Sequence, residues 1–551
     1  MQPVLSAEQI REIDRLTVEN YHTPSLLLME AASSKCMEAI RTRLDGDLTD
    51  RKALILCGKG NNGGDGASLA RAMSRARMHC SVVLFGKLSE TSGDARANFD
   101  AVARLASFEA GSPESPPPLT FIECESVAAW EQIAKPRRAY DIIVDALFGT
   151  GLTRPLEGVY LKVIEHLSML REARERATGV CPLFFSIDIP SGLDADKANP
   201  IGPAVQADLT VTFTAAKAAN VLSPAREFGG ELIIADIGSP SSLIAAAKPR
   251  VFVTEAEDAR AWLVSTRYTP DSYKNTHGHV LIAAGSRGYS GAAALCGNAA
   301  MRSGTGLVTI ATPASAQVSV ASSAMPEVIT TALAETDRGA VCDEAVRHFL
   351  KLAEKATVIA IGPGLTSDDE RTRRFVRSVV EQRTTPCVID ADGLNSLAPW
   401  PAELKGSDEH PLILTPHPGE MLRLIDKSAL DDRVATAREF AVANHVILVL
   451  KGARPLIATP GGRVFINPTG NAGLGTAGAG DTLTGLISGF LAQAYGTLKD
   501  RANAVRATVA ALYIGGLAGD FAAKRLGMRT MLASDIREHF TDAIRFLDPD
   551  V

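Results

Sequence analysis

Two segments of the chain place an aspartate where a short apolar strand is expected to end. Asp145 opens the run DALFGTGLTRPLEG, and Asp188 lies in SIDIPSGLDAD together with Ser191. Glycines follow each aspartate, so a ligand could approach the backbone closely, and an open parallel sheet binds its ligands at the carboxyl ends of its strands. Taken singly, each aspartate could equally be a helix cap or a turn residue. Together the two segments indicate one ligand site.

The segment GKGNNGGDG, residues 58–66, has the composition of a phosphate-binding turn. It lies between the strand-like KALILC and the helix-like ASLARAMSRA, so amides at the start of the helix could face an anion such as a pyrophosphate. Its GxGxxG pattern (Gly58, Gly60, Gly63) is weak by itself. An ordinary dinucleotide-binding fold also places an acidic residue after its second strand, where this chain has FGK at 85–87. A hydride-transferring Rossmann domain is therefore disfavoured. The plain alternative is a turn in which Asn and Gly tolerate positive φ.

A second glycine-rich segment, NAGLGTAGAGDTLTGLISGFLAQ at 471–493, leads into an amphipathic helix. Free amides and the positive end of that helix would converge on Asp481. This arrangement favours a phosphate beside an activating carboxylate, whereas the alternative is that Asp481 merely caps the helix. The chain has no GxxxxGKS or GxxxxGKT segment, so a P-loop enzyme is disfavoured.

Five further motifs follow one another in the second half of the chain. They are GSRGYSGAA from Gly285, IGPGL from Ile361, DADGLN from Asp390, LTPHPGE from Leu414 and LKGARP from Leu450. Each has an ordinary explanation by itself. A histidine between prolines is more often a surface or core residue than a ligand, a lysine at a strand end is usually solvated, and DADG could be a turn. Their order along one stretch of chain makes the set specific.

Short β-branched runs alternate with helical stretches, which favours parallel sheets covered by helices. The expected strands of the first half are 52–57, 80–85, 141–145, 183–188, 208–214 and 231–236. Those of the second half are 279–285, 307–311, 357–361, 387–390, 412–415 and 446–450, with a hairpin at 455–468. The prolines of SPESPPP, residues 112–118, predict an exposed loop.

Length and composition limit the classes of protein to which the chain can belong. The 551 residues exceed the size at which one hydrophobic core stops growing, and the strand pattern pauses at 238–249, so we expect an α/β domain at 1–240 and a second at 250–551. The net charge of −6 offers no basic surface for nucleic acid. Eight cysteines without a CxxC pair predict buried, reduced thiols. No run could span a membrane, and residues 1–17 are too polar for a signal peptide, so a cytoplasmic protein is expected.

The motifs of the first half resemble those of the NAD(P)H-hydrate epimerase family over about residues 1–236. GNNGGDG, D-x-L-F-G-T-G-L and D-I-P-S-G-L-D carry the resemblance, which implies a Rossmann-like three-layer sheet. It also implies that the hydrated nucleotide contacts Asn61, Asn62, Gly63, Gly64, Asp65, Gly149, Thr150, Gly151, Leu152, Thr153, Arg154, Pro155 and Asp188.

The same resemblance implies a potassium ion held by Asn62, Asp145 and Ser191, whose amide, carboxylate and hydroxyl oxygens suit a hard cation. It gives proton transfer to Asp145. Exchange of the R and S hydrates requires the bond from C6 to its hydroxyl to open and re-form, so an acid/base group must lie beside it. The division of acid and base roles between Asp145 and Asp188 stays open.

The second half resembles the ribokinase-like superfamily through GAGD, and its ordered motifs resemble the ADP- or ATP-dependent NAD(P)H-hydrate dehydratase family over about residues 250–545. The resemblance implies that the hydrate site is lined by Ala292, Gly364, His417 and Asp481, the last acting as base toward the C6 hydroxyl. It implies that the adenine nucleotide, with Mg²⁺, is held by Lys451, Gly452, Ala453, Arg454, Pro455 and Gly480. Ala479 departs from the pattern, because the family commonly has a small hydroxyl residue there.

The two resemblances predict one bifunctional repair enzyme for hydrated NADH and NADPH. One domain would epimerise the hydrate and the other would dehydrate its S form at the expense of ADP or ATP, with ADP favoured by the fused order of the domains. A ribokinase-like small-molecule kinase fused to a nucleotide-binding regulatory domain is the alternative. A further alternative is that the first domain only binds partners, and the presence of Asn62, Asp145 and Asp188 argues against it. We also expect a homo-oligomer.

Overall fold

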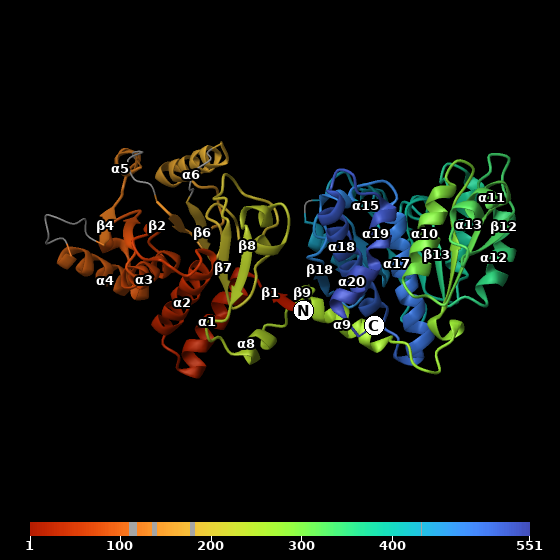
Figure 1. Cartoon of the computed structure of the whole chain (residues 1–551), viewed down its shortest axis with the longest axis horizontal. Helices are drawn as coiled ribbons and strands as arrows, with labels where there is room; N and C mark the ends of the chain where they lie inside the picture. The colour runs from red at the N-terminus through yellow and green to blue at the C-terminus, as the bar shows by residue number, and fades with distance from the viewer. Residues whose placement is uncertain (110–117, 135–139, 177–181, 431, 551) are drawn as a thin grey trace. The chain divides into compact units, whose positions relative to one another are not determined.

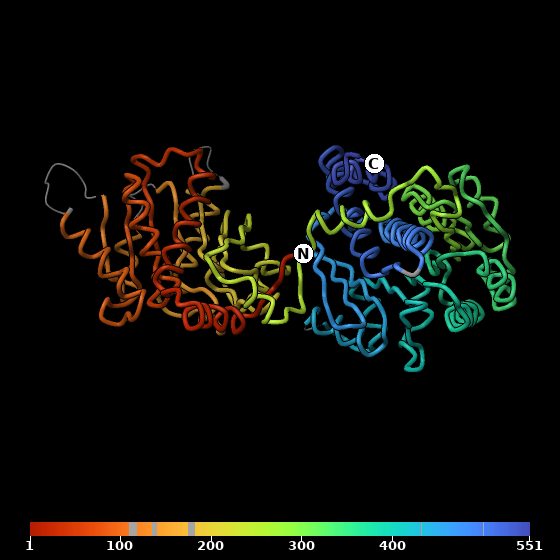
Figure 2. Tube along the Cα trace, turned by 90° about the horizontal axis from the view of Figure 1, so that it is seen from below, coloured from red at the N-terminus to blue at the C-terminus, as the bar shows by residue number. Residues whose placement is uncertain are grey.

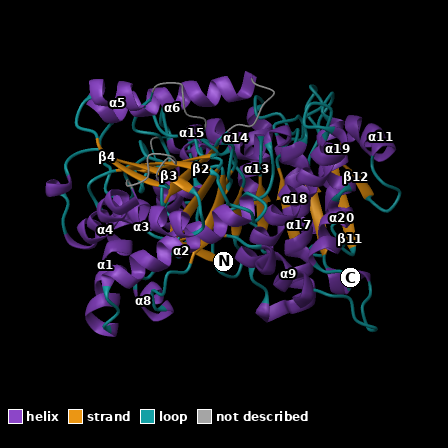
Figure 3. Cartoon of the chain, turned by 60° about the vertical axis from the view of Figure 1, so that its left-hand side comes forward, coloured by secondary structure: helices purple, strands orange, loops and turns teal. Residues whose placement is uncertain are grey.

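The computed structural model describes residues 1–109, 118–134, 140–176, 182–430 and 432–550. The chain divides into two compact units, residues 2–249 and 250–551, each formed by one continuous stretch of chain (Figures 1 and 2). In both units, strands lie between layers of helices (Figure 3). The proline-rich loop predicted at 112–118 falls, except for Pro118, outside the described residues.

The first unit is built on a seven-stranded parallel sheet of order β4-β3-β2-β5-β6-β7-β8. Its strands are β2 (Lys52–Cys57), β3 (His79–Leu84), β4 (Leu119–Glu123), β5 (Ile142–Ala146), β6 (Leu183–Ile187), β7 (Leu209–Phe213) and β8 (Glu231–Ala235). From β2 the chain runs outward to β3 and β4, and then returns to β5 on the other side of β2. Such a reversal opens a crevice at the carboxyl ends of the two strands that flank it.

Helices cover both faces of this sheet (Figure 1). Side chains alternate along each strand, so Ile55 and Val144 face α2 (Ser25–Arg43), α3 (Asn61–Arg75) and α4 (Gly93–Glu109). Leu56 and Ile143 face α5 (Val127–Ile133) and α6 (Gly158–Arg176). The remaining helices of the unit are α1 (Ala7–Tyr21), α7 (Ala218–Val221) and α8 (Ser241–Ala246).

The second unit has a mixed sheet that runs β9-β18-β17-β16-β15-β14-β13-β10-β11-β12. Its strands are β9 (Val251–Val253), β10 (His279–Ala283), β11 (Leu307–Pro313), β12 (Ile329–Leu333), β13 (Val358–Ile361), β14 (Cys387–Ile389), β15 (Leu412–Leu414), β16 (Ile447–Leu450), β17 (Leu456–Ala458) and β18 (Val464–Ile466). The strands from β12 to β16 pair in parallel, and β17 and β18 form the predicted antiparallel hairpin.

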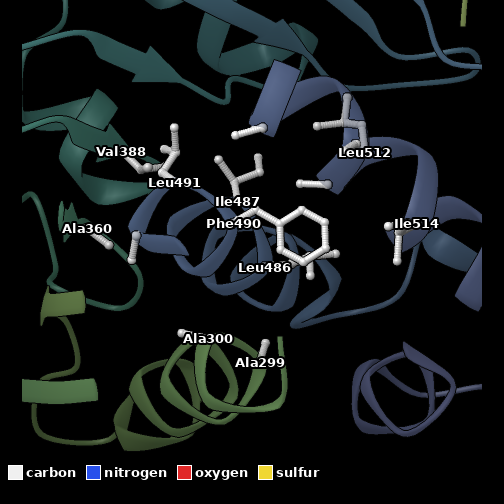
Figure 4. Packing of buried hydrophobic residues seen from close by; sticks show 14 of the residues in the cluster. Ala299, Ala300, Ala360, Val388, Leu486, Ile487, Phe490, Leu491, Leu512 and Ile514 are labelled. Atoms are coloured by element: carbon white, nitrogen blue, oxygen red, sulfur yellow. The ribbon is translucent and has the colours of Figure 1, made fainter. Parts of the chain in front are cut away.

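The helices of this unit are α9 (Ala256–Ser265), α10 (Ser290–Arg302), α11 (Ala314–Ser323), α12 (Val346–Ala353), α13 (Glu370–Glu381), α14 (Asp392–Ser396), α15 (Pro418–Ile425), α16 (Arg433–Asn444), α17 (Ala479–Gln493), α18 (Ala504–Leu526), α19 (Ala533–Glu538) and α20 (Phe540–Leu547). Helix α17 is the centre of the core, where Leu486, Ile487 and Phe490 pack among residues of α10, α18 and the sheet (Figure 4). The Phe490 ring stacks on Trp262 of α9 with centroids 3.9 Å apart.

The predicted α/β fold is confirmed in both halves, and each predicted strand occurs with ends shifted by no more than two residues. The sequence reading missed β1 (Gln2–Val4), β4, β9 and β12, of which β4 and β12 lie at sheet edges, where fewer apolar side chains are needed. The seven described cysteines are buried, as predicted, while Cys181 lies outside the described residues. Among the described helices, none is both long enough and apolar enough to cross a bilayer.

The contact between α10 and α17 gives a prediction on stability. A Cβ added at Gly485 would lie 2.1 Å from the carbonyl oxygen of Cys296. We expect Gly485→Ala to lower the free energy of unfolding of the second unit by about 1–3 kcal/mol, because the two helices would have to separate. Urea unfolding followed by tryptophan fluorescence measures this quantity.

Gly461 is the matched control, because a Cβ there would meet nothing within 4 Å. Gly461→Ala should leave the unfolding curve almost unchanged. Equal effects of the two substitutions would show that the close approach of the helices is not what Gly485 provides.

Candidate functional sites

The first unit holds a cavity of about 650 Å³ at the carboxyl ends of β2 and β5, where the strand order reverses. Of the residues that the sequence predicts, the cavity brings together Asn61, Asn62, Asp65, Gly149, Thr150, Gly151 and Asp188. The other predicted residues are not among those lining it. Leu152 is buried in the core beside α6, and Thr153, Arg154 and Pro155 are exposed on the loop that follows.

Gly63 and Gly66 of GNNGGDG lie in a helix and allow it to pack closely against the ends of β2 and β5, rather than forming a loop. Helix α3 begins at Asn61 with Gly60 as its N-cap, so NNGGD forms the first helical turn, and the expectation that it precedes the helix is wrong. The alternative of a positive-φ turn is wrong too, since none of residues 58–66 has positive φ. A Cβ at Gly63 would lie 1.8 Å from the carbonyl oxygen of Gly58, and one at Gly66 would lie 2.6 Å from the Cβ of Ala146. The absent side chains let the helix start lie directly over the strand ends.

Asp145 lies at the end of β5 and is 1% exposed, beneath the cavity rather than in its wall. Its Oδ1 accepts a hydrogen bond from the Ser191 hydroxyl at 2.6 Å, and its Oδ2 accepts bonds from the Ser191 amide at 2.8 Å and the Ser186 hydroxyl at 3.0 Å. Burial raises the pKa of the Asp145 carboxyl, and the hydrogen bonds from Ser191 partly offset that rise. The predicted pair of Asp145 and Ser191 is therefore brought into direct contact.

Asp188 follows β6 and faces the cavity. It has a φ of +67°, a left-handed conformation that is unusual for a residue other than glycine. A Cβ added at Gly149 would lie 3.0 Å from the Asp188 Oδ2 and 3.2 Å from the Asn62 Oδ1, so Gly149 leaves room for both side chains. The buried Nδ2 of Asn62 has no hydrogen-bond partner among the described residues.

Among the charged residues of this cavity that the sequence reading missed or gave no chemical role, three are shielded from solvent: Asp14 on α1, Asp65 on α3 and Lys217 after β7. Burial raises the pKa of Asp14 to about 6, with Lys217 opposing and Asp188 adding to that rise. Burial, followed by the charges of Asp188 and Asp14, raises the pKa of Asp65 well above its usual value. Lys217 follows a predicted strand, so a search of strand ends for cations as well as acids could have found it. Asp14 carries no such signal.

The second site lies where α17 begins. Helix α17 starts at Ala479 with Gly478 as its N-cap at φ +83°, so Asp481 is the third helical residue and the alternative that it caps the helix is wrong. Burial and, next, the charge of Asp390 raise the pKa of Asp481 to about 7, while Lys451 opposes the rise. A carboxyl that titrates near neutral pH at a helix start is suited to accept a proton.

Lys451, at the end of β16, lies beneath this helix start. Its Nζ donates to the Asp390 Oδ1 at 2.7 Å and lies 3.9 Å from the Glu420 Oε2, and the Thr484 hydroxyl donates to the Asp390 Oδ2 at 2.8 Å. A Cβ added at Gly480 would be 3.4 Å from the Lys451 Nζ. The predicted residues Lys451, Gly480 and Asp481 therefore share one site, to which the structure adds Asp390 and Glu420.

The remaining predicted residues occupy neighbouring loops. Gly364 has φ +64°, and a Cβ there would lie 3.0 Å from the Cβ of Ala292, so these two residues adjoin. The Nδ1 of His417 accepts hydrogen bonds from the amides of Gly419 and Glu420, which makes it the N-cap of α15. Its other ring nitrogen lies 3.5 Å from a Glu420 oxygen.

The loop predicted to hold the nucleotide, residues 451–455, is braced from two sides. Arg433 donates to the carbonyls of Ala453 and Lys451 at 3.0 and 3.3 Å, and Arg454 donates to the carbonyl of Pro468 at 2.8 Å. Gly452 has φ +128°, a conformation that favours glycine. These hydrogen bonds fix the conformation of the loop.

Comparisons with known proteins cover both units. A family model described as NAD(P)H-hydrate dehydratase matches residues 280–542, and one described as YjeF-related protein N-terminus matches residues 25–219. The bifunctional NAD(P)H-hydrate repair enzyme of Moorella thermoacetica is 37% identical over 551 residues, covering 100% of this chain and 98% of that protein. The enzyme of the same name from Thermofilum pendens is 35% identical, covering 99% of this chain and 97% of its own.

A solved structure is also similar to the second unit. It is the ADP/ATP-dependent NAD(P)H-hydrate dehydratase of Bacillus subtilis, co-crystallised with ATP and Mg²⁺. It is 29% identical, covers 54% of this chain and 99% of that chain, and has a TM-score of 0.46.

The contact of Lys451 with Asp390 gives a prediction that does not depend on activity. Lys451→Met should lower the free energy of unfolding of the second unit by about 3 kcal/mol or more, because it leaves the buried Asp390 charge without its partner. Adding Asp390→Asn should recover a large part of that loss. Urea unfolding of the two single variants and the double variant measures the coupling, and simple additivity would mean that the pair contributes no interaction.

Proposed function

The chain belongs to the family of bifunctional NAD(P)H-hydrate repair enzymes, and we propose that each unit performs one of the two reactions at the carboxyl edge of its sheet. The first unit is the epimerase, which interconverts the R and S forms of hydrated NADH and NADPH. The second is the dehydratase, which restores the dihydronicotinamide ring of the S form at the expense of an adenine nucleotide. We assign residues 1–240 to the first activity and 250–551 to the second. The observation that carries the proposal is the partly buried Asp481 beside Lys451 at the start of α17.

In the epimerase, the proposed substrate contacts are the cavity residues Asn61, Asn62, Asp65, Gly149, Thr150, Gly151 and Asp188, with residues 63, 64 and 152–155 around them. The bond between C6 and its hydroxyl must open and re-form, which requires a proton carrier beside that oxygen. Asp188 reaches the cavity directly, whereas Asp145 acts from beneath its wall. We therefore propose that Asp188 faces the reacting hydroxyl and that Asp145 contributes through the cation and the hydroxyl of Ser191.

We propose a potassium ion at Asn62, Asp145 and Ser191. The donors fit, because they supply amide, carboxylate and hydroxyl oxygens, and because the Asn62 amide nitrogen has no partner among the described residues and so leaves its orientation free. Burial raises the pKa of Asp145, and a cation would favour its charged form. When bound, the ion would also attract an oxygen of the substrate.

In the dehydratase, we propose that Asp481 accepts the proton of the C6 hydroxyl while the oxygen of that hydroxyl attacks the terminal phosphorus, which releases AMP from ADP or ADP from ATP. Phosphorylation turns a poor leaving group into phosphate, and loss of phosphate from C6 together with a proton from C5 then restores the ring. Ala292, Gly364 and His417 would hold the hydrate, because Gly364 and Ala292 adjoin and the His417 ring is half exposed, with one nitrogen left after capping α15.

The nucleotide is proposed to bind to Lys451, Gly452, Ala453, Arg454, Pro455 and Gly480. The Lys451 ammonium lies under the amides of the α17 start, and together they favour phosphate. Ala479 has no side-chain hydroxyl that could donate to a phosphate, so backbone amides of the loop must make that hydrogen bond. We propose ADP with Mg²⁺ as the co-substrate, with the ion bound largely by the phosphates of the nucleotide itself.

We propose that the protein acts in the cytoplasm, where its buried cysteine side chains would remain reduced thiols. The homo-oligomer stays a prediction, and sedimentation equilibrium would test it.

Asp145→Asn keeps the size of the side chain and removes its charge. We expect epimerisation to fall by roughly a hundredfold or more, because the cation and the basicity are both lost. Chiral chromatography of the hydrate, with nucleotide omitted, measures this rate. Dehydration of the S hydrate by the same preparation should be unchanged, and full epimerase activity would move the role away from Asp145.

Asp481→Asn should lower dehydration of the S hydrate by on the order of a hundred- to ten-thousandfold and leave epimerisation intact. The measurement is the return of near-ultraviolet absorbance of the dihydronicotinamide ring, with release of inorganic phosphate followed in parallel. A stable phosphorylated product would instead favour a small-molecule kinase. Normal turnover at saturating ADP would remove Asp481 from the mechanism.

The raised pKa of Asp481 sets a pH dependence. Its carboxyl is protonated below about pH 7 and charged above it, and only the charged form accepts a proton. The dehydration rate of the wild type should therefore rise as the pH increases through about 7. Asp481→Asn should lose this acid limb, and an acid limb that persists in the variant would have to belong to another group.

A further inference from the structure

Lys217 is a buried cation in the wall of the epimerase cavity. It follows β7, and it is 1% exposed. Removing an ammonium from water costs several kcal/mol unless charged or polar partners replace the water. Such a residue therefore needs partners that are held in place.

Those partners use every donor that the ammonium has. The Lys217 Nζ donates to the Asp188 Oδ1 at 2.7 Å, to the Thr212 hydroxyl at 2.9 Å and to the Phe213 carbonyl at 3.1 Å. An ammonium has three N–H groups and no acceptor, so none remains for a ligand. Lys217 can thus act on the substrate only through another residue.

That residue is Asp188. Its Oδ1 also accepts a hydrogen bond from the Thr212 hydroxyl at 2.9 Å, and its backbone carbonyl accepts one from the Asn220 amide at 3.2 Å. Its Oδ2 lies toward the cavity, 3.0 Å from where a Cβ on Gly149 would be. One oxygen is therefore anchored and the other is presented to the cavity. The left-handed backbone of Asp188, which costs energy, is held by the same bonds.

The charges around Asp188 make this cation necessary. Asp14 on α1 and Asp65 on α3 line the same cavity and repel a charged Asp188. The other cations of the lining, Arg11, Arg15 and Lys59, differ from Lys217 because they are exposed. Arg15 also pairs with Glu12 and Glu19, and Lys59 pairs with Glu90.

We propose that Lys217 is the positioning residue of the epimerase, which anchors one oxygen of Asp188 and turns the other toward the C6 hydroxyl of the substrate. This inference rests on the proposed epimerase function. It gives a role to a residue outside the glycine motifs, and it requires that Lys217 itself make no contact with the substrate.

The test uses Lys217→Met, Lys217→Arg and, as a matched control, Lys197→Met in the full chain. Lys197 belongs to the same unit, but its side chain is 56% exposed in a pair with Asp194. Epimerisation is measured by chiral chromatography as a function of substrate concentration and pH. Dehydration of the S hydrate reports on the other unit, and near-ultraviolet circular dichroism reports on folding.

With Lys217→Met, we expect kcat of epimerisation at neutral pH to fall by roughly ten- to a hundredfold with KM changed less than about threefold, because the free oxygen of Asp188 is no longer held toward the substrate. Lys217→Arg keeps a charged donor for the Asp188 Oδ1, so its kcat should lie between those of Lys217→Met and the wild type. Lys197→Met should match the wild type throughout.

A rise in KM with an unchanged kcat in Lys217→Met would overturn the proposal, because it would show direct substrate binding. If Lys217→Met does not fold, Lys217→Arg is the test, and a raised KM with an unchanged kcat in that variant contradicts the proposal. Absence of epimerisation in the wild type would instead refute the proposed function of the first unit.

Discussion

Removal of carboxylates from water at the carboxyl ends of parallel strands is the constraint on which both sites depend. A parallel sheet covered on both faces leaves its strand ends as the place where polar side chains can gather. Asp145, Asp188 and Asp390 all lie there, and each is largely buried. A buried carboxylate is stable only where hydrogen-bond donors or cations replace the water, so the surrounding structure must supply them.

The carboxylates of the two sites differ in how firmly their partners hold them. Asp145 is bonded by Ser186 and Ser191, and Asp390 by Lys451 and Thr484, so these groups hold fixed positions. Asp481 has weaker compensation, and burial therefore brings its pKa to about 7. Each unit pairs an aspartate at a strand end with a lysine that follows a later strand. These pairs are Asp188 with the buried Lys217, and Asp390 with the partly buried Lys451.

The sequence could predict the strands and the aspartates at their ends, because β-branched runs and the glycines that follow them are local signals. The parallel sheets covered by helices followed from the alternation of strands and helices. Residues whose role comes from tertiary packing could not be found in this way. Asp14 enters the cavity from a helix without a motif, and the pairing of Lys217 with Asp188 depends on the adjacency of β6 and β7. The sequence did not show that the helix begins at Asn61, because the glycines that follow suggest a turn. Their reason is the close packing of Gly63 against the Gly58 carbonyl, which only the structure shows.

The proposed dehydratase mechanism depends most on the claim that burial raises the pKa of Asp481 to about 7. The direct measurement is a carbon-13 NMR titration of aspartate carboxyl groups, in which the signal of Asp481 is assigned by its loss in Asp481→Asn. The account predicts a midpoint near pH 7 for that signal in the nucleotide-free protein. A midpoint below about 5, close to that of an ordinary aspartate, would contradict it.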